Sequence, residues 1–232
     1  MQVPRVKITI FQLPGHSNHC KTVYKPYFIK MKALIIVDVQ NDFLPGGSLE
    51  VPMGDVIIPL INKLQERFEL VVATQDWHPA DHGSFASKYK DKKVFDKTTL
   101  GGVEQILWPD HCVQGTKGAE ISSELNTHAI EGLFRKGTDP GIDSYSGFFD
   151  NGKKKSTGLA GYLKEKGVSD VYICGLAGDV CVAFTTLDAI DLNFNTFLIK
   201  DATRPIDKNS FYDMINNINK KGGHIIDSAK II

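Results

Sequence analysis

The sequence has no excess of either charge: lysine and arginine total 27, aspartate and glutamate total 27, and the formal net charge is zero. A chain without a net electrostatic field has no general means of recruiting nucleic acid or an anionic membrane surface. It also contains no apolar run long enough to span a membrane. These absences argue against nucleic acid and membranes as partners and favour a small or neutral ligand. The oligomeric state stays open, with a homo-oligomer as one option.

Cysteine is scarce, and its spacing does not suggest a disulfide framework. The 232 residues include four cysteines, at positions 20, 112, 174 and 181, and these form no Cys-x-x-Cys pair. This pattern argues against a disulfide-stapled secreted fold and for a reducing compartment. We therefore expect a cytoplasmic protein.

Residues 1–30 lack the continuous apolar core and the small-residue cleavage site of a secretory signal. Met31 stands directly before the first strong strand pattern. An organellar leader is one interpretation of this segment. We instead expect an extension that is either disordered or not native, followed by one functional domain over residues 31–232.

The length fits one substantial domain better than two. Short apolar runs predict strands at 33–38, 70–75, 129–134, 171–175, 194–199 and 224–227. Helical patterns cover 55–68, 158–166, 179–193 and 209–221, and Ser156 is expected to cap the second of these. Apolar strands separated by helices indicate a three-layer α/β/α fold with a largely parallel sheet of about six strands. Ligands bind such sheets at the carboxyl ends of the strands.

The stretch VYICGLAGDVCVAF, residues 171–184, predicts a buried strand, a glycine-rich turn and a helix whose first turn carries Cys181. A helix N-terminus stabilises a thiolate and offers N–H groups that can hold a developing oxyanion. Cys181 is therefore a candidate nucleophile. The alternative is a small buried apolar residue, which is the role we assign to Cys174 inside its strand and to Cys112.

Two ionisable residues follow predicted strands. Asp38 comes at the end of the first strand, where burial would be costly unless the carboxylate is paired or used. A turn-capping aspartate is the alternative. Lys136 follows the third strand, where a lysine is ordinarily a solvated flank, so the residue pattern alone gives it no role.

The segment TQDWHPADHGSF, residues 74–85, concentrates metal-ligating side chains. Asp76, His78 and His82 have the spacing D-x-H-x3-H, and His111 follows in WPDHC. One carboxylate and three imidazoles suit zinc, iron(II) or manganese, with positions left for water or substrate. Exposed loop histidines are the alternative. Asp81 is a weaker candidate ligand.

Taken together, five separated motifs resemble those of the nicotinamidases, within the isochorismatase-like cysteine hydrolase superfamily. In chain order they are LIIVDVQNDFLPGGSL, ATQDWHPADHGSFA, WPDHCVQGTKGAE, FRKGTDPGIDSYSGF and GLAGDVCVAFTTLDA. The resemblance extends from Met31 to the C-terminus, which makes 31–232 an isochorismatase-like hydrolase domain.

The resemblance implies a catalytic triad of Asp38, Lys136 and Cys181, and it gives Lys136 a role that its local sequence does not. It also implies a cis peptide bond at Leu176–Ala177 and an oxyanion hole formed by the backbone N–H groups of Ala177 and Cys181. The implied metal ligands are Asp76, His78, His82 and His111. Phe43, Trp108 and Tyr145 match positions that line the ring pocket of the family.

The implied activity is hydrolysis of nicotinamide to nicotinate and ammonia through a cysteine thioester, in NAD salvage. One divalent metal ion is implied, with zinc as the first candidate and iron or manganese as alternatives. A metal-free relative acting on another amide or a vinyl ether is the main competing enzyme hypothesis. Outside enzymes, the chain could be an inactive binding protein that keeps the fold, or a structural zinc module.

Overall fold

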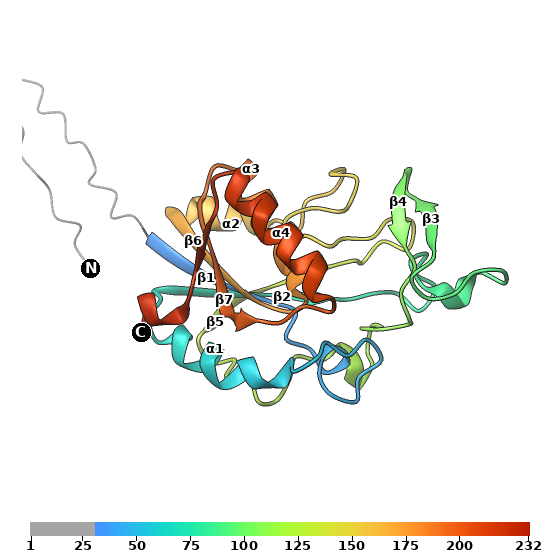
Figure 1. Cartoon of the computed structure of the whole chain (residues 1–232), viewed down its shortest axis with the longest axis horizontal. Coiled ribbons are helices and arrows are strands. Elements are labelled where there is room, and N and C mark those ends of the chain that lie inside the picture. Colours follow the sequence, from blue (N-terminus) through green and yellow to red (C-terminus); the bar gives the residue numbers. More distant parts are fainter. Residues whose placement is uncertain (1–30) are drawn as a thin grey trace, which may run out of the picture. The chain divides into compact units, whose positions relative to one another are not determined.

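The six predicted apolar runs form one sheet in the protein's structure, a computed structural model that describes residues 31–232. The expectation for residues 1–30 lies outside the described residues. The strands are β1 (Met31–Val37), β2 (Leu70–Asp76), β5 (Ile130–Lys136), β6 (Val168–Gly175), β7 (Asn195–Thr203) and β8 (His224–Ile226). Their order is β5-β2-β1-β6-β7-β8, and every neighbouring pair is parallel (Figure 1).

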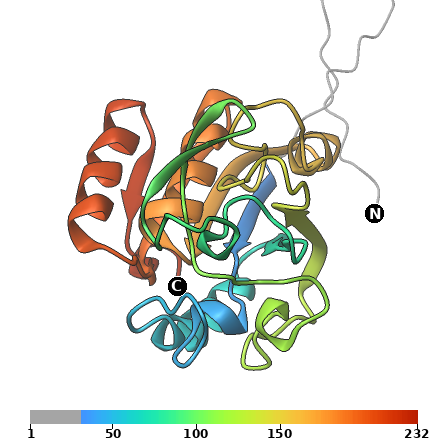
Figure 2. The ribbon, with the colours of Figure 1, turned by 90° about the vertical axis from the view of Figure 1, so that its right-hand side faces the viewer.

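Within residues 31–232, four α-helices cover the two faces of this sheet (Figures 1 and 2). They are α1 (Ile58–Gln65), α2 (Leu159–Glu165), α3 (Ala183–Asp191) and α4 (Lys208–Lys220). Apolar side chains of α1 pack on one face, whereas those of α2, α3 and α4 pack on the other. The expected three-layer α/β/α fold is therefore confirmed. Within residues 31–232, no helix has the length and apolar character needed to cross a bilayer.

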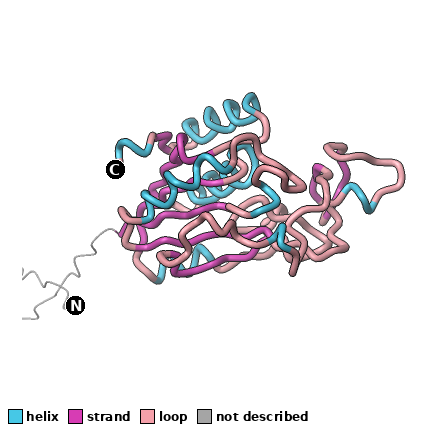
Figure 3. The backbone as a smooth tube through the Cα atoms, turned by 90° about the horizontal axis from the view of Figure 1, so that it is seen from below, coloured by secondary structure: helices cyan, strands magenta, loops and turns pink. Residues whose placement is uncertain are grey.

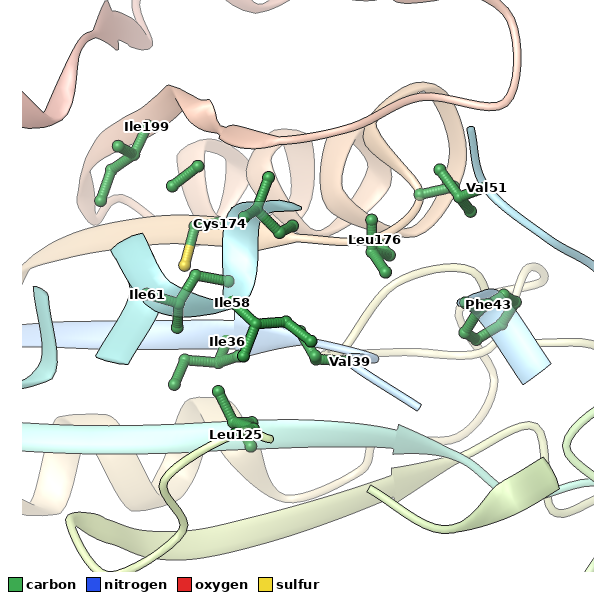
Figure 4. Packing of buried hydrophobic residues seen from close by; sticks show 14 of the residues in the cluster. Ile36, Val39, Phe43, Val51, Ile58, Ile61, Leu125, Cys174, Leu176 and Ile199 are labelled. Atoms are coloured by element: carbon green, nitrogen blue, oxygen red, sulfur yellow. The ribbon is translucent and has the colours of Figure 1, made fainter. Parts of the chain in front are cut away.

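The cluster under α1 shows how the continuous apolar strands are buried on both sides. Ile58 and Ile61 of α1 lie over Ile36 of β1 and Cys174 of β6 (Figure 4). Cys174 is fully buried in this cluster, as its assignment to a small apolar role predicts.

Two local features differ from the sequence-based expectations. The N-cap of α2 is Gly158, at φ 92°, and Ser156 is not the cap. The Ser156 hydroxyl instead accepts a hydrogen bond from the Gly158 N–H and closes the turn before the helix. The helix expected from residue 179 begins as a π-helical turn (Gly178–Val182) that leads into α3.

A two-stranded hairpin was not predicted. Strands β3 (Lys97–Leu100) and β4 (Val103–Ile106) pair antiparallel around Gly101 and Gly102, whose φ values of 61° and 88° favour glycine. The hairpin is separate from the main sheet and lies on the side toward which β1 runs (Figures 1 and 3). Its short, largely polar strands carry no continuous apolar run, so the pattern that identified the other strands is absent.

Candidate active site

Sheet order brings four ionisable side chains to adjacent strand ends. Lys136 is the last residue of β5 and Asp76 the last of β2, while Asp38 directly follows β1. Cys181 lies in the π-helical turn after β6. Because β5, β2, β1 and β6 are neighbours in that order, these residues converge at one edge of the sheet, where ligand crevices of α/β folds occur.

Lys136 is the centre of this group. Its Nζ lies 2.9 Å from Asp38 Oδ2 and 3.0 Å from Asp76 Oδ1, and it donates to the Ser144 carbonyl oxygen at 3.0 Å. The Sγ atom of Cys181 lies 3.4 Å from the same nitrogen. The side chain of Lys136 is buried, so the solvated flank expected from its local sequence is wrong.

Asp38 adopts a left-handed backbone conformation, with φ 49°, at the point where the chain leaves β1. Its Oδ1 accepts a 2.6 Å hydrogen bond from the Thr74 hydroxyl, and Oδ2 faces Lys136. One carboxylate oxygen of Asp38, one of Asp76 and the sulfur of Cys181 all lie within 4.8 Å of one another. The carboxylate is therefore close enough to exchange a proton with the thiol after small adjustments.

The electrostatics of the thiol differ from the expected stabilised thiolate. Burial raises the pKa of Cys181 well above its ordinary value, although the Lys136 ammonium acts in the opposite direction. Burial also raises the pKa of Asp38, against the attraction of Lys136. The nearby carboxylates raise the pKa of Lys136, despite its burial, so the amine is charged. The resting sulfur is thus a thiol that needs a base during attack.

The turn before Cys181 has the expected cis peptide bond at Leu176–Ala177. Ala177 is buried and, within residues 31–232, its N–H donates to no backbone acceptor. Ala177 and Cys181 both line the same cavity.

The histidine-rich segment forms two overlapping groups of buried donor atoms. In the first, Asp76 Oδ2 lies 3.2 Å from His78 Nε2 and 3.5 Å from His111 Nε2. In the second, one donor atom each of His78, His82 and Asp143 lie within 4.8 Å of one another. His78 belongs to both groups, so the four expected ligands are brought together through it.

Hydrogen bonds orient the three imidazoles. The Nδ1 atoms contact Gly137 O at 2.9 Å for His78, Ser84 Oγ at 2.7 Å for His82 and Pro109 O at 2.8 Å for His111. A carbonyl partner fixes the proton on Nδ1 and leaves Nε2 free as a ligand. In the described part of the chain, neither His78 Nε2 nor His82 Nε2 has a hydrogen-bond partner of good geometry. Buried imidazole nitrogens of this kind beside a carboxylate fit a divalent metal ion.

The two ring systems of the second group have opposite pKa shifts. Burial lowers the pKa of His82 to about 4, so this ring is neutral at pH 7. Burial also disfavours charge on His78, but the Asp76 carboxylate outweighs it and raises the pKa of His78 to about 8. At pH 7 the His78 imidazole therefore carries a proton on Nε2, and a metal ion bound at this atom would replace the proton. Asp81, the weaker candidate ligand, is exposed and belongs to neither group.

A small cavity of about 20 Å³ lies beside Cys181, Asp76 and His111. Its lining consists of Phe43, Leu49, Asp76, Trp108, His111, Asp143, Tyr145, Ala177, Val180, Cys181 and Ile206. The three aromatic residues expected to line a ring pocket are all present. Trp108 Nε1 donates to the Tyr145 hydroxyl oxygen at 3.3 Å, and the Phe43 ring lies 5.6 Å from that of His111.

Several residues of this site were not predicted. Asp143 joins the second donor group, and Ile206, from the loop after β7, forms part of the cavity wall. Asp179 accepts hydrogen bonds from the backbone N–H groups of Ile206 and Asp207. Their positions along the sequence carry no local signal, because each acts through a contact between distant segments.

Comparisons with known proteins place the chain in a family. The Isochorismatase domain family matches residues 32–230. The nicotinamidase of Acinetobacter baylyi is 51% identical over 177 residues, covering 76% of this chain and 83% of that protein.

Solved structures are similar over most of the chain. The nicotinamidase/pyrazinamidase of Acinetobacter baumanii has a TM-score of 0.85 and 45% identity, covering 88% of this chain and 99% of its own. The pyrazinamidase of Pyrococcus horikoshii, solved in complex with zinc, has a TM-score of 0.70 and 38% identity, covering 85% and 99%.

Proposed function

The chain belongs to the Isochorismatase domain family, and on this premise we propose that it is a nicotinamidase, which hydrolyses nicotinamide to nicotinate and ammonia. The observation that carries the proposal is the Lys136 ammonium, which lies between the Asp38 carboxylate and the Cys181 sulfur beside the aromatic cavity. The high identity to nicotinamidases supports the substrate. We assign the reaction to NAD salvage in the cytoplasm.

In the first half of the reaction, Asp38 accepts the thiol proton as the sulfur of Cys181 attacks the carboxamide carbon. The raised pKa of the thiol makes this proton transfer part of the attack. A carbon–sulfur bond forms, and the carbonyl oxygen becomes an oxyanion that the N–H groups of Ala177 and Cys181 hold. Collapse of this adduct breaks the carbon–nitrogen bond, and ammonia leaves with the proton held by Asp38.

In the second half, Asp38 takes a proton from water as the water oxygen attacks the thioester carbon. The adduct collapses to nicotinic acid, which loses its proton to solvent to give nicotinate, and the proton held by Asp38 returns to the Cys181 sulfur. Lys136 stays protonated throughout and offsets the negative charge that moves between Asp38 and the sulfur.

Asp76, His78, His82 and His111 would hold a divalent metal, for which zinc is our first candidate because a similar pyrazinamidase binds it. When bound, such an ion supplies a Lewis acid for the pyridine nitrogen, a borderline ligand comparable to imidazole. Phe43, Trp108 and Tyr145 enclose the ring, exclude water and orient the carboxamide toward Cys181.

Replacement of the thiol gives a direct test. We expect the wild-type protein to release ammonia from nicotinamide and Cys181→Ala to lower the rate by at least roughly 10³-fold, because no nucleophile remains. Cys174→Ala is the matched control, since Cys174 is equally buried but lies in the apolar cluster under α1. It should keep the wild-type rate.

Two results would contradict the proposal. A wild-type rate in Cys181→Ala would exclude this sulfur as the nucleophile. Metal-loaded wild-type protein that releases no ammonia would exclude nicotinamide as the substrate and favour the metal-free alternatives.

A further inference from the structure

Gln105 is a buried polar residue on β4, in the hairpin that no motif of the sequence identified. Its side chain is 0% exposed. The two N–H groups of the carboxamide nitrogen are shared among three acceptors: the Ile106 carbonyl oxygen at 2.7 Å, the Tyr145 hydroxyl at 2.9 Å and Asp143 Oδ2 at 3.0 Å. Its oxygen accepts from Asn151 Nδ2 at 3.3 Å. A buried amide with this many partners holds its neighbours in fixed positions.

The partners of this amide nitrogen are not typical of a residue that only stabilises a hairpin. Its one backbone partner, Ile106, is the next residue in the chain, whereas its two side-chain partners both line the substrate cavity. Gln105 itself does not line the cavity. It can therefore influence a bound ring only through Tyr145 and Asp143.

Of Tyr145 and Asp143, Tyr145 makes more contacts with the other pocket residues. Its hydroxyl oxygen accepts from both Gln105 Nε2 and Trp108 Nε1, and its ring packs edge-on to the Trp108 ring with centroids 6.1 Å apart. The hydrogen bond from Gln105 thus fixes the position of two aromatic walls together. Asn151 contributes from the other side, since its side-chain oxygen accepts from the Tyr145 backbone N–H at 2.9 Å.

We propose that Gln105 is a positioning residue for the ring pocket: from β4 it holds the Tyr145 hydroxyl and the Asp143 carboxylate, and so sets the pocket wall against which nicotinamide binds. This role rests on the proposed function. A preformed wall contributes equally to ground-state and transition-state binding, because it contacts the ring and not the reacting carboxamide. Its loss should therefore raise KM and leave kcat nearly unchanged.

The first variant for the test is Gln105→Met, which keeps the length and bulk of the side chain but removes its donors. We expect KM for nicotinamide to rise about 5- to 10-fold, as for the loss of one hydrogen bond, with kcat within about 2-fold. Tyr145→Phe should give a similar increase, because it removes the same bond and leaves Gln105 intact. The increase in KM of the double variant should be smaller than the product of the two single increases, because both changes remove the bond between Gln105 and Tyr145.

Gln65→Met is the matched control. Gln65 is as buried as Gln105, but it lies on α1 and donates to Asn62 Oδ1, away from the cavity. It should leave KM unchanged. Circular dichroism establishes that each variant is folded, and Tyr145→Phe tests the same bond should Gln105→Met not fold.

Three results would overturn the inference. KM of Gln105→Met could equal that of Gln65→Met, kcat could fall with KM unchanged, or the effects of Gln105→Met and Tyr145→Phe could be additive. A wild-type protein without nicotinamide turnover would overturn the proposed function and this inference together. If the wild-type protein turns over nicotinamide and the KM of Gln105→Met equals that of the wild type, only the inference would be overturned.

Discussion

Lys136 neutralises only part of the negative charge around it. Its ammonium lies about as far from Asp38 as from Asp76, so two buried carboxylates share one cation. Burial disfavours charge on His78, but the Asp76 carboxylate raises its pKa to about 8, so a proton on this imidazole offsets the remaining negative charge. A divalent cation bound to Asp76 and His78 would take the place of this proton, so the charge balance at this edge of the sheet is compatible with the proposed metal.

The fall of kcat/KM at low pH, the acid limb of the pH profile, should follow the protonation of Asp38. Burial raises the pKa of Asp38, while the Thr74 hydroxyl, which bonds the charged form, lowers it. Only the ionised carboxylate can accept the thiol proton, so kcat/KM should fall with decreasing pH through a midpoint above the ordinary carboxyl range. Thr74→Val removes a hydrogen bond that favours the charged form and should move this midpoint to higher pH.

The measurement is kcat/KM against pH with the metal content determined at each point, because acid also protonates the imidazoles. Thr196→Val is the control: Thr196 is buried on β7, and its hydroxyl donates to the Phe194 carbonyl oxygen, near the opposite end of the sheet. An acid limb that moves equally in both variants, or in neither, would contradict the assignment to Asp38.

The residues of the site differ in how well the sequence predicted them. Asp38, Cys181 and the histidines stand in unusual local contexts, which mark them without any tertiary information. Lys136 was identified only through the family resemblance, because its burial depends on the sheet order β5-β2-β1-β6. Gln105 gave no signal at all, since a glutamine in a polar hairpin is ordinary until its partners are known.

At the level of secondary structure, Asp179 links two elements that approach the cavity. It lies in the π-helical turn that carries Cys181, and its two carboxylate oxygens accept from the N–H groups of Ile206 and Asp207 at 2.9 and 3.0 Å. These residues belong to the loop between β7 and α4, and Ile206 lines the cavity. One side chain thus connects the nucleophile turn to the pocket wall.

Asp179→Ala should affect both stability and substrate binding. We expect a loss of about 2 kcal/mol of unfolding free energy, because two partly buried N–H groups lose their acceptors. KM for nicotinamide should rise, because Ile206 is no longer held. Chemical denaturation and steady-state kinetics measure the two effects.

Asp207→Ala separates these effects. The Asp207 side chain caps α4 by accepting from the Ser210 N–H at 2.7 Å, so its removal should cost about 1 kcal/mol of stability. KM should stay at the wild-type value, because the loop keeps its bonds to Asp179. Equal KM values in Asp179→Ala and Asp207→Ala would argue against the link to the cavity.

The strands were more predictable than the turns between them. Apolar runs identified all six strands of the main sheet, and they are most continuous in β1, β2 and β6, where a parallel strand covered on both faces has little room for polar residues. The α2 cap and the β3–β4 hairpin were missed or misassigned. A cap depends on backbone geometry that several residues could provide, and the hairpin is held by contacts with distant loops, such as the Gln105 bonds.

Over the whole of residues 31–232, most of the apolar core lies away from the metal site. The two apolar clusters lie mainly between the sheet and its helices and reach the cavity at Phe43, Trp108 and Cys181, whereas the donor groups lie at the carboxyl edge of the sheet. The main contribution to folding is the burial of these clusters, which needs no metal. A structural zinc module, by contrast, depends on its metal for folding.

Metal removal should therefore abolish activity without unfolding the protein. After chelation, we expect ammonia release to fall to background, far-UV circular dichroism at 25 °C to stay unchanged, and Tm to fall by roughly 5–10 °C through loss of ligand stabilisation. Zinc add-back should restore both activity and Tm. If the chelated protein is unfolded at 25 °C, the metal has a structural role. If a protein shown to be metal-free keeps full activity, the result favours the metal-free branch of the family. The donor geometry favours neither of these two results, because Asp76, His111 and Asp143 line the substrate cavity and no proposed metal ligand belongs to the apolar clusters that stabilise the fold.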